Sequence, residues 1–388
     1  MKTMLIIQHY GGVGGSGIGL LSTIQALKDK FNIVIYCPKK PDKLYYYYKS
    51  LGLNVKMLQF NFGTIPYYNG GTPWFCKSFY KEIYLIKKSK FYFKKIIKKE
   101  KPDIVLVNSL IMAWVSDLKK IYNCKYICHV RETIPTKWSI IGYLLNKKLE
   151  NFDMVFFISN YDRDYHNLKY PRQYIVRDSL RSDTNILFRK QNREILKKIL
   201  FVGGADPLKG LDIALDAIKF CKTPGLKLLI AGEIPSCLTT KSEKVVVKGL
   251  FKKLYFFKIK KLLNDVDIYS KVVIIGHKND ISDLYKELDF VVFPSKKPHQ
   301  ARPAIEAGEF YKPIVISNYP QTKESIIDDF NGKVFKSNSS TELAIVIDYL
   351  YKNENIIFEM GENNHNIVIE KHLYSKVCSK LATIFTSM

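Results

Sequence analysis

The sequence predicts an α/β protein of two domains, each built around a parallel sheet. The chain has 388 residues, which is long for one hydrophobic core and fits two domains of ordinary size. Short apolar runs alternate with helix-length amphipathic segments, which is typical of parallel strands covered on both faces. This alternation restarts after a charged stretch at residues 181–198. We therefore predict an N-terminal domain over residues 1–185, a C-terminal domain over 186–372 and a final helix over 373–388.

Apolar runs of strand length occur along both halves of the chain and are rich in Ile, Val, Leu and Phe. The strands expected in the first half are Leu5–Gln8, Ile33–Cys37, Val55–Leu58, Ile104–Asn108, Tyr126–Val130 and Met154–Ser159. Those expected in the second half are Ile199–Gly203, Lys227–Ala231, Val245–Lys248, Val272–Ile275, Phe290–Pro294 and Ile314–Ser317. Helices are expected between them, because consecutive parallel strands need a crossover connection.

Composition indicates where the protein acts. No run of about 18 apolar residues occurs, so we expect no transmembrane helix. The first residues, MKTMLIIQHYGG, lack the cleavage site of a signal peptide and fit a first strand. The seven cysteines include no Cys-x-x-Cys pair, which argues for reduced thiols in a cytoplasmic protein and against a metal site.

The formal net charge is +25, and it is uneven along the chain. Residues 1–180 hold 29 Lys and Arg against 12 Asp and Glu, a difference of +17 that leaves +8 for the remainder. Such a balance favours nucleic acid, anionic lipid or phosphorylated substrates. No nucleic-acid recognition motif accompanies the charge, so we expect no nucleic-acid partner. A solvated lysine-rich surface is the alternative explanation.

Two segments, Lys77–Lys101 and Leu250–Leu263, place aromatic and aliphatic residues at helical spacing between lysines. Each predicts a basic amphipathic helix suited to an anionic membrane surface. In the first segment, Tyr84, Phe91 and Phe93 would insert into lipid if they point outward. The alternative for both segments is a helix that packs on the core and turns its lysines to solvent.

The glycine-rich segment Gly11–Gly19 follows the first expected strand and contains G-x-G-x-x-G from Gly12 onward. A dinucleotide site would need an acidic residue after the second strand. The chain has Lys39–Lys40 there, which suits only a 2′-phosphate and leaves an NADP-dependent oxidoreductase as one alternative. In the other interpretation, the backbone at Gly14 and Gly15 lies close to a substrate, because glycine permits such an approach.

The segment Phe293–Ser317 predicts an anion site. It starts as a buried strand and continues as a polar loop, a helix that carries Glu306 and a second strand. Free backbone N–H groups and the helix dipole favour phosphate at such a helix N-terminus. Lys209, which follows the turn Gly203–Pro207 and opens another helix, is electrostatically unfavourable there unless an anion binds.

These motifs resemble the retaining glycosyltransferases of family 4, which have the GT-B fold. The resemblance covers residues 199–345 well and the first half at scattered points. It rests on Phe293–Ser317 and on Ile199–Ala217, Leu228–Glu233, Val272–Gly276, Asp280–Ser295, Glu324 and Asn331–Gly332. It implies two Rossmann-like domains that face a central cleft.

The resemblance also implies the chemistry. A nucleotide-diphosphate sugar would donate its sugar, with retention and without a metal or other cofactor, to an oligosaccharide or lipid-linked acceptor. The pathway implied is a bacterial envelope polysaccharide such as capsule, lipopolysaccharide or O-antigen, made at the inner face of the cytoplasmic membrane. Lys209 and the backbone would hold the diphosphate, Glu306 the ribose and His129 the sugar. The further substrate-binding residues implied are Gly14, Gly15, Arg131, Glu132, Gly203, Gly204, Ala301, Arg302 and Pro303.

Two positions depart from the family pattern. The family has Glu eight residues before the equivalent of Glu306, where this chain has Pro298. The family also has Arg where this chain has Gly204. By motif position, Arg302 and Arg131 are candidates for the missing cation. The departures keep a non-catalytic module that binds nucleotide sugar or membrane as a second alternative.

Overall fold

The computed structural model describes residues 1–65, 77–133, 140–183, 194–240, 242–247, 249–278, 280–298 and 300–387. The chain divides into two compact units. Unit 1 comprises Met1–Arg181 together with Tyr374–Met388, and unit 2 comprises Ser182–Leu373. The division therefore falls at the start of the charged stretch 181–198, of which residues 184–193 lie outside the described residues.

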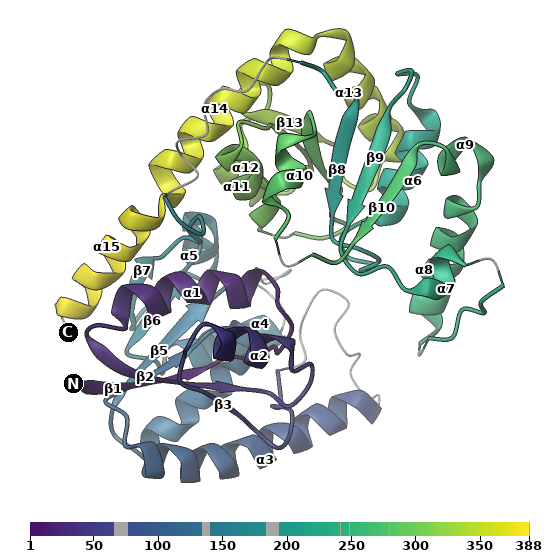
Figure 1. Cartoon of the computed structure of the whole chain (residues 1–388). Coiled ribbons are helices and arrows are strands. Elements are labelled where there is room, and N and C mark those ends of the chain that lie inside the picture. Colours follow the sequence, from purple (N-terminus) through teal and green to yellow (C-terminus); the bar gives the residue numbers. More distant parts are fainter. Residues whose placement is uncertain are drawn as a thin grey trace. The chain divides into compact units, whose positions relative to one another are not determined.

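The described residues of unit 1 form a seven-stranded parallel sheet in the order β3-β2-β1-β4-β5-β6-β7 (Figure 1). Its strands are β1 (Lys2–Ile7), β2 (Phe31–Cys37), β3 (Val55–Met57), β4 (Ile104–Val107), β5 (Lys125–Val130), β6 (Met154–Phe157) and β7 (Arg172–Ile175). Its helices are α1 (Gly15–Leu27), α2 (Lys43–Ser50), α3 (Lys77–Glu100), the 3₁₀ helix η1 (Leu110–Lys120), α4 (Ile140–Leu149), α5 (Asn160–His166) and α15 (Tyr374–Thr386).

Both faces of this sheet are covered, as the apolar strands require. In β4, Val105 and Val107 pack in the cluster with α3 and η1, whereas Ile104 and Leu106 pack in the cluster with α1 and α15. The final helix α15 belongs to unit 1, where the ring of Phe385 meets the ring of Phe31 edge-on at 5.7 Å between centroids.

Unit 2 has a six-stranded parallel sheet in its described part, in the order β10-β9-β8-β11-β12-β13. Its strands are β8 (Lys198–Val202), β9 (Lys227–Ala231), β10 (Val272–Gly276), β11 (Phe290–Phe293), β12 (Ile314–Ser317) and β13 (Gly332–Phe335). Its helices are α6 (Leu211–Phe220), α7 (Ser236–Thr239), α8 (Leu250–Leu263), α9 (Val266–Tyr269), α10 (Ser282–Lys286), α11 (Arg302–Glu309), α12 (Thr322–Ser325), α13 (Ser340–Lys352) and α14 (Glu354–His372).

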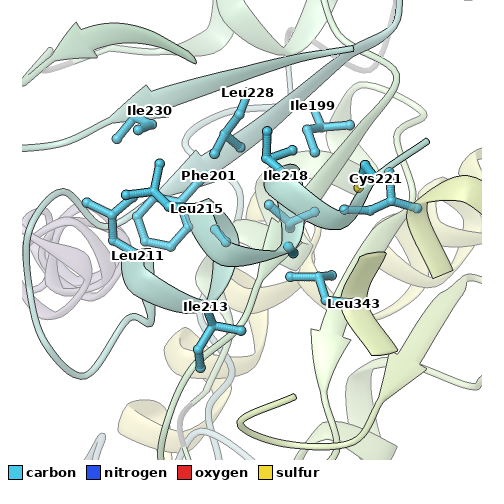
Figure 2. Close-up of a cluster of buried hydrophobic side chains, with 14 of the residues drawn as sticks. Ile199, Phe201, Leu211, Ile213, Leu215, Ile218, Cys221, Leu228, Ile230 and Leu343 are labelled. Carbon is cyan, nitrogen blue, oxygen red and sulfur yellow. The ribbon is translucent and has the colours of Figure 1, made fainter. Parts of the chain in front are cut away.

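Figure 2 shows the larger core of unit 2, where Leu211, Leu215 and Ile218 of α6 pack against Phe201 and neighbouring strand residues. The strand β11 alternates between the two faces. Phe290 and Val292 contribute to this core, while Val291 and Phe293 pack on the opposite face with α11.

Two details of the strand prediction differ from the structure. The expected strand Val245–Lys248 is wrong for residues 245–247, and residue 248 lies outside the described part. Val245 is instead buried in the core beside α6 and α8, and β10 pairs with β9 at that sheet edge. The strands β7 and β13, which complete the two sheets at their other edges, were not predicted.

Within the described residues, the structure contains no helix long and apolar enough to cross a membrane.

Candidate functional site

The predicted donor residues of unit 2 gather at the centre of its sheet. β8 and β11 are neighbours, but β8 leads to β9 on one side and β11 leads to β12 on the other. Ligands of open parallel sheets bind outside the carboxyl ends of strands at such a switch point. The loop after β8 carries Lys209, and the loop after β11 leads to Glu306. The sheet order therefore brings the two predicted motifs to one place.

The two loops are in direct contact. Gly210 has a φ of +78°, and a Cβ built on it would lie 1.9 Å from the carbonyl oxygen of Pro294. The Lys296 amide donates to the Leu208 carbonyl at 2.9 Å. A glycine is needed at position 210 because both its left-handed conformation and this close approach exclude a side chain.

Amides of the turn after β8 are bonded within the protein. The Gly203 and Gly204 amides both donate to Ala231 at 3.0 Å, and that of Ala205 donates to the Glu233 carbonyl at 3.0 Å. The Lys209 amide donates to Asp206. These amides stabilise the turn, which makes the Lys209 side chain its candidate group for anion binding.

The Lys209 side chain is mostly buried. Its stem lies against Gly203, where a Cβ would be 2.6 Å from Cγ of Lys209, and its Nζ is 5.2 Å from the centroid of the Phe293 ring. Burial lowers the pKa of Lys209 to about 8, and the attraction of Asp206 opposes this shift only in part. A neighbouring anion would restore the preference for the charged form.

The glycine at position 204 has a structural reason in this chain. Its φ is +56°, and an added Cβ would lie 2.5 Å from the Glu233 carbonyl oxygen. An arginine at this position, as in the family pattern, would require a different turn. The backbone conformation of this loop, which packs on the loop after β9, therefore explains why glycine replaces arginine at position 204.

Glu306 is held by two donors from the protein. The Tyr285 hydroxyl donates to its Oε2 at 3.0 Å, and Nε of Arg302 donates to its Oε1 at 3.0 Å. Tyr285 is fully buried and stacks on Phe310 with 5.5 Å between ring centroids. The carboxylate thus has a fixed position and retains capacity to accept further hydrogen bonds.

The N-terminus of α11 differs from the expectation of free amides. The Arg302 amide donates to the Gln300 carbonyl at 3.2 Å, the Ala304 amide donates to Ala301 at 2.9 Å, and Pro303 has no N–H. The expectation of an open amide cradle at Arg302 and Pro303 is therefore wrong, because the first turn is tightened onto itself. Pro298, in the loop before it, supplies no carboxylate.

Lys296 lies in the loop after β11 beside the candidate residues, and the sequence interpretation did not single it out. Its Nζ donates to Oδ2 of buried Asp212 at 2.7 Å and lies 5.0 Å from the centroid of the Tyr255 ring. This ion pair ties the loop after β11 to the start of α6. Its position directly after the Pro-Ser end of β11 was the available sequence signal.

Unit 1 has the same topology at its centre. β1 and β4 are neighbours, with β2 on one side and β5 on the other. Polar residues directly follow these strands. The Asn108 side-chain amide donates to Oε1 of Gln8 at 2.7 Å and to the Ser16 carbonyl at 3.0 Å, which joins β1, β4 and α1.

Arg131 connects this group to the far strands. Its Nε donates to Oδ1 of Asn108 at 2.7 Å, Nη1 forms an ion pair with Asp178, and Nη2 donates to Nδ1 of His129 at 3.3 Å. Gly19 of α1 lies directly above, since a Cβ there would be 2.5 Å from Nη1 of Arg131. The guanidinium is buried and its charge is balanced within unit 1.

His129 is buried with both ring nitrogens engaged. Its Nε2–H donates to the Val176 carbonyl at 3.2 Å, which leaves Nδ1 to accept from Arg131. Burial, followed by the charge of Arg131, lowers the pKa of His129 to about 3. The imidazole is therefore neutral and orients Arg131, and its predicted contact with the sugar stays a prediction.

The other candidate residues of unit 1 lie near the carboxyl ends of the same central strands. Glu132 accepts from the Ser109 hydroxyl and, at 2.8 Å, from the Leu110 amide at the start of η1. Gly14 is the N-cap of α1, with Gly15 as the first helical residue and open space where a Gly14 Cβ would lie. The packing of unit 1 therefore does not require glycine at position 14.

His9 is a second residue that the sequence interpretation missed. It directly follows β1 and is half-buried, with Nδ1–H donating to the Asn108 carbonyl at 3.2 Å. Burial lowers its pKa, although the Glu132 carboxylate opposes the shift. Its place after a central strand was the signal available in the sequence.

Across the described ranges, no group of three or more His, Cys, Asp or Glu side chains is arranged to hold a metal ion.

Comparison with protein families divides the chain in the same way. Residues 13–176 match the family model of Glycosyltransferase Family 4, and residues 183–367 match that of Glycosyl transferases group 1. The first match starts inside the glycine-rich segment and falls within unit 1, and the second falls within unit 2. The glycine pattern is thereby part of a glycosyltransferase family, and the oxidoreductase alternative loses its support.

Individual relatives are distant. An uncharacterized glycosyltransferase of Methanocaldococcus jannaschii is 25% identical over 244 residues, and the match spans 61% of this chain and 60% of that relative's length. The crystal structure of HepE from Anabaena with UDP-glucose has a TM-score of 0.77 at 14% identity over the whole of both chains. WaaB, a lipopolysaccharide outer core galactosyltransferase, has a TM-score of 0.68 at 14% identity, also over both whole chains.

The structural similarities establish the fold, and the two family models establish the family. Together the models cover both units and leave out only short segments at the ends and at the division between the units. The two parallel sheets with central switch points are the Rossmann-like halves that this fold requires. This chain belongs to the GT-B glycosyltransferases, with a family 4 N-terminal region and a group 1 C-terminal region.

Proposed function

We propose that this protein transfers a sugar, with retention, from a nucleotide-diphosphate sugar to a saccharide or lipid-linked acceptor. The observation that carries the proposal is Lys209 at the β8/β11 switch point. A buried ammonium whose pKa has fallen to about 8 costs the fold free energy, which a bound diphosphate would offset. Structural neighbours from Anabaena have been crystallised with UDP and UDP-glucose, which is compatible with such a ligand.

Bond breaking between the sugar and the diphosphate places negative charge on the leaving oxygen. Lys209 would balance this charge, and fixed positive groups at the point of charge development are the main source of electrostatic catalysis. Glu306 would accept hydrogen bonds from the ribose, since Arg302 and Tyr285 hold its carboxylate in place. Neither role uses a metal ion or another cofactor.

The acceptor would bind at the carboxyl ends of the central strands β1 and β4 of unit 1. His9, Glu132 and the N-terminus of α1 at Gly14 and Gly15 surround these strand ends. Arg131 and His129 would position these groups from below. The alternative of a non-catalytic sugar-nucleotide module has Pro298 in its favour, because that loop residue offers no carboxylate.

We place the reaction in envelope polysaccharide synthesis at the inner face of the cytoplasmic membrane, with α3 of unit 1 as a membrane contact. In α3, Tyr84 and Phe91 are exposed, as the lipid-binding interpretation requires. Phe93 is wrong as an inserting residue, because it is fully buried in the core of unit 1. α3 nevertheless carries exposed lysines along its length, among them Lys87, Lys94 and Lys95.

Charge reversal tests the role of α3. Each lysine near an anionic surface contributes about 1 kcal/mol to membrane binding. Four Lys→Glu changes should abolish binding to anionic vesicles at low salt, with folding and activity on a soluble acceptor analogue unchanged. The changes are made at Lys87, Lys88, Lys94 and Lys95. The control carries the same four changes at exposed lysines of other elements of unit 1, namely Lys2, Lys28, Lys49 and Lys120.

A ligand panel tests the proposed reaction. Thermal shift against UDP-, ADP-, GDP- and CDP-sugars should identify one class that raises the apparent melting temperature, because a ligand of the native state stabilises it. Transfer from that donor to a saccharide acceptor, followed by NMR of the anomeric proton, then reads out turnover and stereochemistry. Donor binding without transfer or hydrolysis would support the non-catalytic module.

A further inference from the structure

The helix α8 of unit 2 has apolar side chains on two opposite sides. Tyr255, Phe256, Ile259 and Leu263 are buried in the main core of the unit. Leu250, Leu254 and Phe257 lie on the other side of the helix, at the i, i+4, i+7 spacing of one helical stripe. Only the first set is explained by packing within the unit.

The outward stripe is well exposed. Leu250 is 68% exposed and Leu254 57%, and Phe251 beside them is 89% exposed. Phe257 is also exposed, with the ammonium of Lys253 at 5.9 Å from its ring centroid. Side chains of this size rarely gather on a free surface of a soluble protein unless the surface has a partner.

The charged residues of α8 itself are all lysines. α8 reads LFKKLYFFKIKKLL and contains no acidic residue. Lys258 is already paired with Asp212 and Asp216 of α6. Lys253 and Lys261, which lie at helical spacing beside the stripe, remain exposed. The stripe thus joins apolar side chains with exposed positive charge, the combination that binds the headgroup region of an anionic bilayer.

We propose that the outward face of α8, formed by Leu250, Phe251, Leu254 and Phe257 with Lys253 and Lys261, docks on an anionic lipid surface. A protein partner is less well matched, because interface cores are depleted of lysine, whereas a lipid headgroup layer takes lysines and aromatic rings together. The inference deepens the proposed function, on whose lipid-linked acceptor it rests. It assigns the donor-binding unit a membrane contact of its own, separate from α3.

Vesicle flotation with the full chain tests this surface. The probe is vesicles of equal parts phosphatidylcholine and phosphatidylglycerol at low salt, with pure phosphatidylcholine vesicles in parallel. Phe251→Ser with Leu254→Ser should weaken binding to the anionic vesicles at least tenfold and leave the melting temperature unchanged. The matched control is Ile327→Ser with Ile345→Ser, which removes two exposed apolar side chains from other parts of unit 2. It should bind like the parent protein.

Three results would overturn the inference. The α8 variant binds anionic vesicles like the parent. The control variant loses as much binding as the α8 variant does. Sedimentation shows instead that the parent self-associates through α8 and ignores vesicles. Nucleotide-sugar binding by the same α8 variant separates this question from the proposed reaction, because α8 lies outside the donor loops and the variant should bind donor normally.

Discussion

Arg131 in unit 1 and Lys209 in unit 2 are both buried cations at the central switch point of a parallel sheet, yet their surroundings differ. Arg131 is balanced by Asp178 and bonded to Asn108 and His129. Burial is the main cause of the lowered pKa of Lys209, and Asp206 opposes this shift only in part. A cation held in an ion pair and two side-chain hydrogen bonds supports structure, whereas a cation whose pKa burial lowers would gain from a ligand of opposite charge. From this comparison we propose a positioning role for Arg131 and anion binding for Lys209.

The largest effect expected from this contrast is on the stability of unit 1. Arg131→Ala leaves Asp178 without its buried counter-ion and leaves Asn108 and His129 each without one hydrogen bond. Removing one partner of a buried ion pair costs about 3–5 kcal/mol. Urea unfolding should show this loss in the free energy of unfolding. A variant as stable as the parent would contradict the structural role of Arg131.

Lys209→Ala should have the opposite signature. A hydrogen bond to a charged group contributes about 1.5–3 kcal/mol, so affinity for the nucleoside diphosphate should fall at least tenfold in calorimetry. The free energy of unfolding should stay equal or rise, because the variant no longer buries an ammonium. Lys197→Ala, on the same unit outside the donor loops, is the control. Unchanged diphosphate affinity in Lys209→Ala would remove the donor assignment.

His129→Ala should affect the functions of the two units differently. The change unpairs the Val176 carbonyl and loosens Arg131, which should cost about 1–3 kcal/mol of stability. Turnover should fall, since the acceptor edge is less well ordered, while diphosphate affinity stays nearly that of the parent. An equal loss of diphosphate affinity in calorimetry would show that His129 acts on the nucleotide instead.

The smallest effect is expected at Arg302. Its Nη1 is buried with no acceptor among the residues described, so Arg302→Leu should change stability by about 1 kcal/mol or less. Glu306 would then keep only Tyr285, and discrimination between a ribonucleotide and its 2′-deoxy analogue should weaken. Glu306→Ala should abolish that discrimination and lower the affinity for the nucleotide at least tenfold. Discrimination unaltered in Arg302→Leu would limit the guanidinium to a structural role.

The fold was predictable because its signals are local. Continuous apolar strands such as Ile104–Val107 and Phe290–Phe293 indicate parallel sheets on their own. The placement of Lys209 and Glu306 together also follows, since both motifs come after strands that the fold makes neighbours. Phe91, Tyr92 and Phe93 show the limit of such patterns, because three consecutive rings fit either side of a helix and packing buried only Phe93.

The hydrogen bonds of the candidate site could not be predicted from the sequence. The pattern around Arg302 and Pro303 predicts a helix start, but the closing of that first turn onto Gln300 and Ala301 depends on the loop conformation. Likewise, the capture of His129 by Val176 joins residues 47 positions apart. Contacts of this kind depend on how side chains turn after the sheets have formed.

The pH dependence of nucleotide binding tests the account of Lys209 most directly. Calorimetry is run from about pH 7 to about pH 10 with the nucleoside diphosphate that binds best, whose phosphates are already ionised in this range. Only the protonated lysine attracts the anion, so affinity should fall as pH rises above about 8, by up to about tenfold per pH unit. Lys209→Arg, which stays charged, should bind with little pH dependence. A parent protein whose affinity is flat across this range, or a Lys209→Arg variant with the same decline, would contradict the assignment of Lys209 as the donor-binding cation.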